Sequence, residues 1–151
     1  MRPSKIISGG QTGADQAGLH AAKILKIKTG GTAPYNYMTD EGPNLGLLRS
    51  YGLNPGPYDP KTYPKRTRIN IADSDGTVIF KALGIRSPGS QLTINICIAM
   101  NKPHIINPTP SRLRKWVEDQ GILTLNVAGN RERINPGLEE RVTKILVEAF
   151  T

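Results

Sequence analysis

The stretch Lys5-Ile6-Ile7-Ser8-Gly9-Gly10-Gln11-Thr12-Gly13-Ala14-Asp15 decides the fold, because a short apolar run leads through three glycines directly into a helical pattern. Residues 5–8 are predicted to form a strand and residues 14–26 a helix, whose apolar face repeats at the helical period with Ala17, Ala21, Ile24 and Leu25. Glycines at such a turn let the backbone approach a ligand closely, since no Cβ stands in the way. The first amides of the helix lack intrahelical partners and suit an anion such as phosphate.

The same glycine turn is open to a second interpretation, a tight turn that holds no ligand. Its spacing is not the dinucleotide fingerprint G-x-G-x-x-G, and it lacks the lysine of a P-loop. Asp15 falls in the first helical turn, where the helix dipole favours a carboxylate. It therefore either stabilises the helix or contacts a ligand hydroxyl or an ordered water.

Strands and helices alternate along the rest of the chain. The further expected strands are residues 27–32, 77–80, 103–107 and 122–127, and the further expected helices are 45–51, 91–101, 110–120 and 135–149. This order predicts an α/β protein with a Rossmann-like, three-layer αβα architecture and a mostly parallel sheet of about five strands. The 151 residues are expected to form a single ligand-binding domain, residues 1–151.

Some segments have a less regular pattern. Residues 52–64 hold four prolines and are expected to be irregular, and residues 69–72 are interpreted as a helical turn rather than a strand. Ser90 is the expected N-cap of the helix at 91–101. Residues 33–44 are expected to be a loop without regular structure, and loops of this length are often functional in compact domains.

The net charge of +8 indicates either an anionic ligand or nonspecific affinity for nucleic acid. The densest basic cluster is Lys61, Lys65, Arg66 and Arg68. Nucleic acid is the less favoured partner, because the sequence contains no recognisable nucleic-acid module and few aromatic residues for stacking on bases.

The cellular setting is predicted from what the chain lacks. No apolar run is long enough to span a membrane, and the first residues leave no room for a signal peptide. The single cysteine, Cys97, has no partner for an internal disulfide. A cytoplasmic protein without a membrane partner is therefore expected.

Four polar segments follow predicted strands or open predicted helices, at residues 9–15, 74–77, 87–93 and 129–132. The loops at the carboxyl ends of parallel strands meet at one crevice. We therefore expect one anion site with two helix N-termini and the planar fork of Arg131, which suits phosphate. The predicted ligand-binding residues are Gly9, Gly10, Gln11, Thr12, Gly13, Asp15, Ser74, Asp75, Gly76, Thr77, Gly89, Ser90, Thr93, Asn130 and Arg131.

No catalytic residue and no metal ligand is assigned, because no grouping has a metal-ligand spacing and no Ser-His-Asp order has a nucleophile elbow. Binding is therefore favoured over catalysis. The alternative is an enzyme acting on a nucleotide or its glycosidic bond, with Asp15, Asp75 or Glu132 as acid or base. Residues 73–77 also resemble the nucleophile motif of haloacid-dehalogenase-type phosphatases, although those enzymes need a later acidic pair that the predicted strand ends lack.

The helix predicted at residues 91–101 is apolar nearly all round. This pattern indicates burial on more than one side and, in a small domain, a subunit interface. A homo-oligomer, dimer or tetramer, is therefore expected. Cys97 is expected to lie in the core rather than to act as a nucleophile, because no basic residue flanks it to lower its pKa.

Five segments, in this order, resemble the family named putative molybdenum carrier: IISGGQTGAD (6–15), APYNYMTDEG (33–42), SDGT (74–77), SPGS (87–90) and LNVAGNRE (125–132). The resemblance covers nearly the whole chain. It implies a single Rossmann-type domain of the SLOG group, which also contains the lysine-decarboxylase-like and cytokinin-activating LOG proteins.

The resemblance further implies a homo-oligomeric carrier of molybdenum cofactor (molybdopterin), a phosphorylated pterin with a dithiolene-bound oxo-metal, and molybdenum enzymes as partners. The glycine turns at residues 9–13 or 89–90 would hold its phosphate. LOG-type phosphoribohydrolases carry a catalytic Glu after a Pro-Gly-Gly-x-Gly-Thr motif. The matching turn here, residues 88–93, has no Glu, which argues against the alternative of a phosphoribohydrolase.

Overall fold

The computed structural model describes residues 2–151 and contains one five-stranded sheet. Its strands are β1 (Lys5–Ser8), β2 (Lys28–Gly30), β7 (Gly76–Phe80), β8 (His104–Ile106) and β9 (Thr124–Gly129). They lie in the order β2-β1-β9-β7-β8, and every pairing is parallel. β7 is buried along its whole length, as expected for a central strand covered on both faces. The predicted α/β, Rossmann-like architecture is confirmed.

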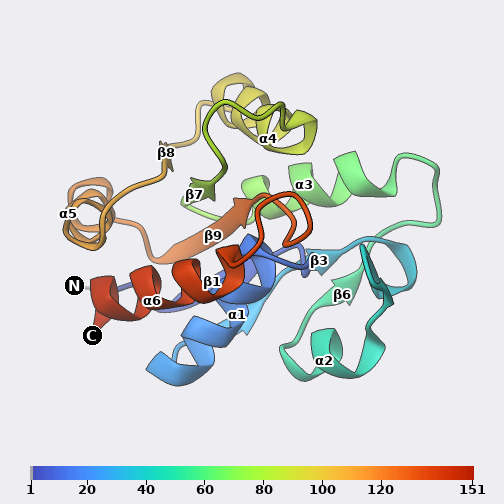
Figure 1. The fold of residues 1–151 in the computed structure, drawn as a ribbon, viewed down its shortest axis with the longest axis horizontal. Helices are drawn as coiled ribbons and strands as arrows, with labels where there is room; N and C mark the ends of the chain where they lie inside the picture. The colour runs from blue at the N-terminus through green and yellow to red at the C-terminus, as the bar shows by residue number, and fades with distance from the viewer. Residues whose placement is uncertain (1) are drawn as a thin grey trace.

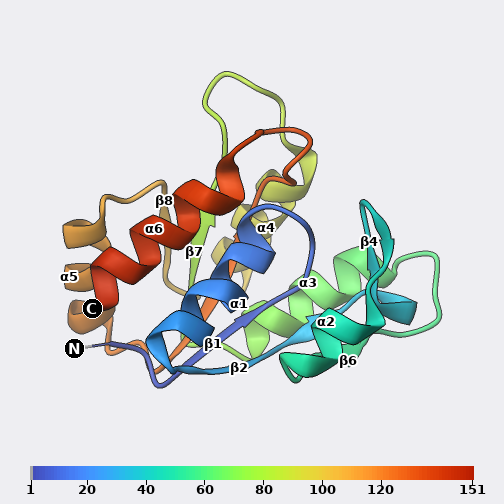
Figure 2. The same cartoon turned by 60° about the horizontal axis from the view of Figure 1, so that its bottom comes forward.

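Helical layers cover both faces of the sheet (Figures 1 and 2). The large helices are α1 (Ala14–Leu25), α3 (Thr62–Ala72), α4 (Pro88–Ala99), α5 (Pro110–Gln120) and α6 (Leu138–Phe150). On one face α6 packs against α1 and α5, and on the other α3 packs against α4. The main core lies under the first group and includes the fully buried Ile6, Leu125 and Val142. Gly18 brings α1 close to β9, since a Cβ there would lie 2.7 Å from the Val127 Cβ.

The order of the strands places the last one in the middle. β9 lies between β1 and β7, although both precede it in the chain. If β9 and α6 came before β1, the strands would follow the doubly wound order 3-2-1-4-5. Ligands bind such sheets beyond the carboxyl ends of the strands, where the order reverses. Here that point lies at the ends of β9 and β7, beside β1.

The segment between β2 and α3 forms a small substructure at the edge of the sheet. It contains β3 (Thr32–Ala33), the 3-10 turn η1 (Tyr35–Tyr37), β4 (Met38–Thr39), β5 (Gly42–Pro43), α2 (Leu45–Ser50) and β6 (Asn54–Pro55). β3 pairs with β6, and β4 pairs with β5 as an antiparallel hairpin. The prediction that residues 33–44 lack regular structure is therefore wrong. Leu48 and Leu53 give this segment its own small core against Leu19.

α3 is the largest departure from the sequence-based expectation. Residues 52–64 were expected to be irregular and residues 69–72 to form only a turn, whereas one helix runs from Thr62 to Ala72. Pro64 is compatible with this helix because it lies in the first turn, where backbone N–H groups have no intrahelical acceptor. α4 also starts earlier than expected, with Ser87 at the N-cap position, so Ser90 is not the N-cap.

Across residues 2–151, each helix is too short or too polar to cross a membrane.

Candidate functional site

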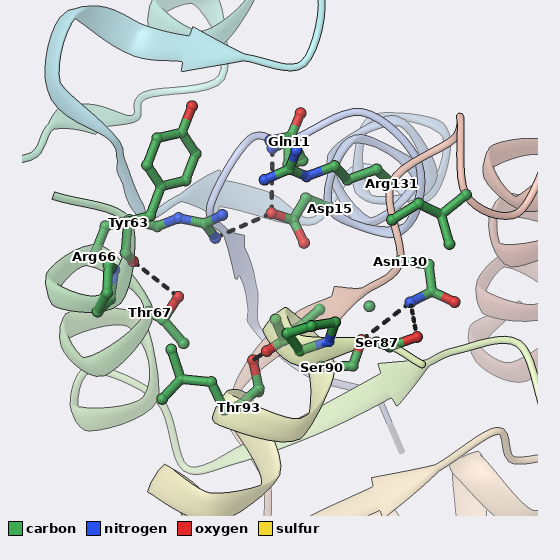
Figure 3. Close-up of a pocket in the computed structure, with 17 residues that line it drawn as sticks. Gln11, Asp15, Tyr63, Arg66, Thr67, Ser87, Ser90, Thr93, Asn130 and Arg131 are labelled. Atoms are coloured by element: carbon green, nitrogen blue, oxygen red, sulfur yellow. Dashed lines mark hydrogen bonds and ion pairs between the residues drawn. The ribbon is translucent and has the colours of Figure 1, made fainter. Parts of the chain in front are cut away.

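A cavity of about 380 Å³ opens at the carboxyl ends of β1, β9 and β7 (Figure 3). Its walls are the turn after β1, the first half of α3, the start of α4 and the segment that follows β9. The cavity lies where the strand order predicts a ligand crevice. Its volume falls in the range of small-molecule sites.

The first two glycines of the β1–α1 turn accommodate other parts of the protein. A Cβ at Gly9 would overlap the guanidinium of Arg66, so Gly9 lets Arg66 cross the turn. Gly10 has a φ of 78°, and a Cβ there would lie 2.8 Å from Leu48. Both glycines were expected to let a ligand approach; side chains of the protein pack against both, and Gly9 also lines a small cavity beside Asp15 and Arg66.

The N-terminus of α1 is covered by the chain that follows β9. A Cβ at Gly13 would overlap the backbone of residues 130–132. The Ala14 amide donates to the Asn130 carbonyl oxygen at 3.2 Å, and Thr12 Oγ1 accepts from the Glu132 amide at 3.4 Å. The expectation that two helix N-termini face the crevice is therefore wrong for α1, because the protein's own backbone occupies that position.

The N-terminus of α4, by contrast, is open toward the cavity. Gly89 is exposed, and a Cβ there would meet no atom within 4 Å. Pro88 occupies the start of the helix, and no described side chain caps it. The amides of Gly89 and Ser90 therefore keep donors without intrahelical acceptors, at the positive end of the helix dipole. This end of the cavity suits an anion.

Arg66 and Asp15 form a buried ion pair in the cavity wall. Nη1 of Arg66 lies 3.2 Å from Oδ2 of Asp15, and the two side chains are 14% and 5% exposed. The Gln11 amide donates to the same oxygen at 3.2 Å. Burial raises the pKa of Asp15 above its ordinary value, and the charge of Arg66 acts against this rise.

Two guanidinium groups and an aromatic ring form one wall. The Cζ atoms of Arg66 and Arg131 lie 5.8 and 6.0 Å from the ring centroid of Tyr63. Figure 3 shows these three side chains across the cavity from Ser90 and Thr93. The cavity thus has a cationic wall opposite a wall of hydroxyls and free amides.

The β4–β5 hairpin reaches this site through Asp40. Its carboxylate pairs with Arg131 Nη1 at 3.1 Å and with Arg133 Nε at 2.8 Å, and its amide donates to Gln11 Oε1 at 2.6 Å. The hydrogen bond from Arg133, followed by the charges of both arginines, lowers the pKa of Asp40 below its ordinary value despite some desolvation. These contacts join the hairpin to the segment that carries Arg131.

Asn130 holds the start of α4 in place. Its Nδ2 donates to the hydroxyls of Ser87 and Ser90 at 2.9 and 3.2 Å, and its Oδ1 accepts from the Ala82 amide at 2.6 Å. Asn130 therefore positions the β7–α4 turn from the end of β9.

Part of the predicted ligand set comes together here. The predicted residues that line the cavity are Gln11, Asp15, Gly89, Ser90, Thr93, Asn130 and Arg131. Three other predicted residues lie at the amino ends of the strands, away from the cavity: Ser74, Asp75 and Gly76. β7 begins at Gly76, so this segment leads into a strand and does not follow one. The Asp75 carboxylate accepts from the Leu123 and Thr124 amides. Thr77 lies within β7 and accepts from Asn126 Nδ2.

The contribution of α3 to the cavity was not predicted from the sequence. Tyr63, Arg66 and Thr67 line the cavity from one helix face, where residues three and four positions apart stand together. That spacing was visible in the sequence, but the nearby prolines obscured the helix and the basic cluster was considered only for nucleic acid.

Other candidate groups lie away from the cavity. Cys97 is fully buried, as expected, and burial raises the pKa of its thiol. Glu132 accepts from the Gly137 and Glu139 amides at the start of α6. Among the described residues, no cluster of three or more His, Cys, Asp or Glu side chains is placed to hold a metal ion.

Comparison with known proteins agrees with this fold. The chain is similar to a protein from Syntrophus aciditrophicus SB that is named putative molybdenum carrier protein. The two sequences are 34% identical, and the crystal structure of that protein superposes on this one with a TM-score of 0.84. The match covers 98% of this chain and 94% of the other. No curated protein matches the chain. The model of the circularly permutated YpsA SLOG family matches residues 6–150, and its description agrees with the central position of the last strand. The chain therefore belongs to the circularly permutated YpsA SLOG family.

Proposed function

We propose that this protein binds a small phosphorylated ligand in the large cavity, with the phosphate at the N-terminus of α4, and that the ligand is molybdenum cofactor. One observation carries the proposal: Gly89 and Ser90, at the uncapped start of α4, line the same cavity as Arg66 and Arg131. Free helical amides and guanidinium groups are the donors that proteins use for phosphate.

The cavity suits the chemistry of this cofactor. Its volume of about 380 Å³ accommodates a small ligand, and its cationic wall favours an anionic one. The name of the Syntrophus aciditrophicus protein is the support for molybdenum cofactor in particular. In this proposal the protein is a cytoplasmic homo-oligomer that carries the cofactor for molybdenum enzymes.

Gly89→Asp tests the phosphate position directly. A carboxylate in the first turn of α4 would occupy the proposed phosphate position and repel the phosphate. The affinity for the phosphorylated ligand should therefore fall by about tenfold or more. Gly46→Asp is the matched control, because Gly46 is also the second residue of a helix and faces open space. Titration calorimetry with molybdenum cofactor and with adenosine monophosphate provides the measurement.

Arg131→Ala should likewise weaken binding, since it removes one of the two guanidinium groups. Mass spectrometry of the small molecules released from the purified protein would identify the retained ligand. A protein that retains no phosphorylated compound and binds neither titrant would refute the proposal.

A second function is favoured by one observation: Asp15 is a buried carboxylate in the cavity wall with a raised pKa. Such a group suits acid or base catalysis on the glycosidic bond of a nucleotide. Asp75 and Glu132, the other two candidates, hold backbone amides elsewhere. An assay of base release from nucleoside monophosphates should show turnover that Asp15→Asn abolishes, and a panel without turnover would exclude the enzyme.

A further inference from the structure

A second, much smaller cavity extends inward from the large one. Its volume is about 10 Å³, which is roughly the space that one water molecule needs. Asp15, Arg66, Thr67, Thr93 and Ala128 line both cavities. The small cavity is therefore the inner end of the proposed ligand site.

Two polar atoms of the residues around this inner cavity are buried and have no partner among the described residues: Arg66 Nε and Asn126 Oδ1. Asn126 is only 3% exposed, and its Nδ2 donates to Thr77 Oγ1 at 3.2 Å. Arg66 is held by its bond to Asp15. Buried polar groups in proteins are nearly always paired, so this donor and this acceptor indicate a group that meets both.

A hydroxyl oxygen is the group that fits. It accepts a hydrogen bond from Arg66 Nε and donates one to Asn126 Oδ1, whereas a carbonyl or carboxylate only accepts and an ammonium only donates. A phosphate group is too large for a volume of about 10 Å³.

We infer that the inner cavity is a hydroxyl subsite, which holds one water molecule in the free protein and one hydroxyl group of the ligand in the complex. This inference rests on the phosphate position of the proposed function, because the hydroxyl belongs to a ligand whose phosphate lies at α4; the closed pyranopterin form of molybdenum cofactor has no alcohol hydroxyl and would leave the water in place. The site therefore selects phosphorylated ligands with a free hydroxyl, such as a ribose phosphate, over analogues that lack it.

The first experiment is a high-resolution crystal structure of the free protein. The expected result is one ordered water within hydrogen-bonding distance of both Arg66 Nε and Asn126 Oδ1. In Asn126→Leu the acceptor is gone and the water should be absent. An inner cavity that is dry in the native protein would overturn the inference.

The second experiment compares adenosine monophosphate with its 2′-deoxy and 3′-deoxy analogues by calorimetry. The native protein should bind the hydroxylated form about tenfold more tightly than one of the analogues, because a site built for a hydroxyl rejects its absence. Asn126→Leu should remove this preference, measured as the ratio of the affinities for the hydroxylated and deoxy forms within the same variant. Asn126→Asp keeps an acceptor at the same position and should retain the preference, and circular dichroism establishes that both variants fold.

The outcomes separate the two proposals. Equal affinity of the native protein for all three nucleotides would overturn the hydroxyl subsite while phosphate binding stands. Failure of all three to bind, with the ordered water in place, would restrict the inner cavity to a water site and overturn the ligand half of the inference, while the proposed function is tested separately with molybdenum cofactor.

Discussion

Gly9 is a position at which a single methyl group would disturb the cavity wall. The Arg66 guanidinium lies over its Cα and reaches Asp15 across the turn. A residue with a side chain at this position would displace the guanidinium, which is the flexible end of Arg66. The buried carboxylate of Asp15 would then lose its charged partner.

Gly9→Ala should therefore lower both stability and ligand affinity. Leaving a buried charge without its partner costs about 3–5 kcal/mol, and unfolding by urea would measure the loss. Gly46→Ala is the control, because a Cβ there meets open space in a helix, and it should be neutral or stabilising. Native stability and affinity in Gly9→Ala would show that Arg66 can rearrange without cost.

The glycine turn also shows what a sequence leaves open at the residue scale. Its position at the end of β1 was predicted correctly, because an apolar run followed by glycines and a helical period is a local pattern. Which atoms pack against the glycines was not, because Arg66 lies 51 residues further along the chain. The backbone amides that can bind an anion lie at the start of α4, where a Cβ at Gly89 would meet no atom within 4 Å.

At the scale of elements, the β4–β5 hairpin is joined to the segment after β9 by one carboxylate. Asp40 forms ion pairs with Arg131 and Arg133. Of these two arginines, Arg131 lines the cavity and would also contact an anionic ligand. A ligand phosphate would compete with Asp40 for Arg131. The position of this hairpin is therefore linked to the state of the cavity.

Asp40→Asn should release the hairpin at neutral pH, seen as faster amide hydrogen exchange at residues 38–43. Glu41→Gln is the matched control, because the Glu41 carboxylate forms no ion pair with any other described residue. Since the pKa of Asp40 is lowered from its ordinary value of 3.8, the ion pairs are complete above that value and are lost as pH falls through the lowered pKa. Nuclear magnetic resonance should show this acid transition in the native protein and not in Asp40→Asn.

α3 marks the limit of sequence-based prediction for elements. Strands and helices with a clear apolar period, such as β1, α1 and α6, were predicted close to their observed bounds. α3 has a weak period and a proline in its first turn, and its stability depends on packing against α4 and β3 rather than on local pattern. Because α3 carries Tyr63 and Arg66, missing the helix also meant missing the cationic wall.

For the whole molecule, the strand order leads to a prediction about connectivity. Arg2, the first described residue, lies close to the end of α6, because its Nη1 donates to the Phe150 carbonyl oxygen at 3.4 Å. A permuted chain that begins at Gly121, with the old ends joined by a short flexible linker, would have the doubly wound order. It should fold with the same sheet and bind the ligand with unchanged affinity, since nearby surface ends tolerate permutation.

The comparison for that permutant is a chain opened between Gly129 and Asn130, which would disconnect the cavity wall from β9. It should lose ligand binding while the first permutant retains it, as measured by calorimetry and circular dichroism. An unfolded first permutant would show that the order of connection, and not only the contacts, is needed for folding.

The central place of the last strand also has a consequence for biosynthesis. A ribosome makes β1, β2, β7 and β8 before β9, and neither β1 nor β7 has its shared neighbour until residue 129 has been made. The nascent chain therefore presents one unpaired inner strand edge after β1 has been made and two after β7 is complete, until β9 is made, and such edges are prone to pair with other chains. This protein is most exposed to misassembly just before its synthesis ends, when its two half-sheets exist without the strand that joins them.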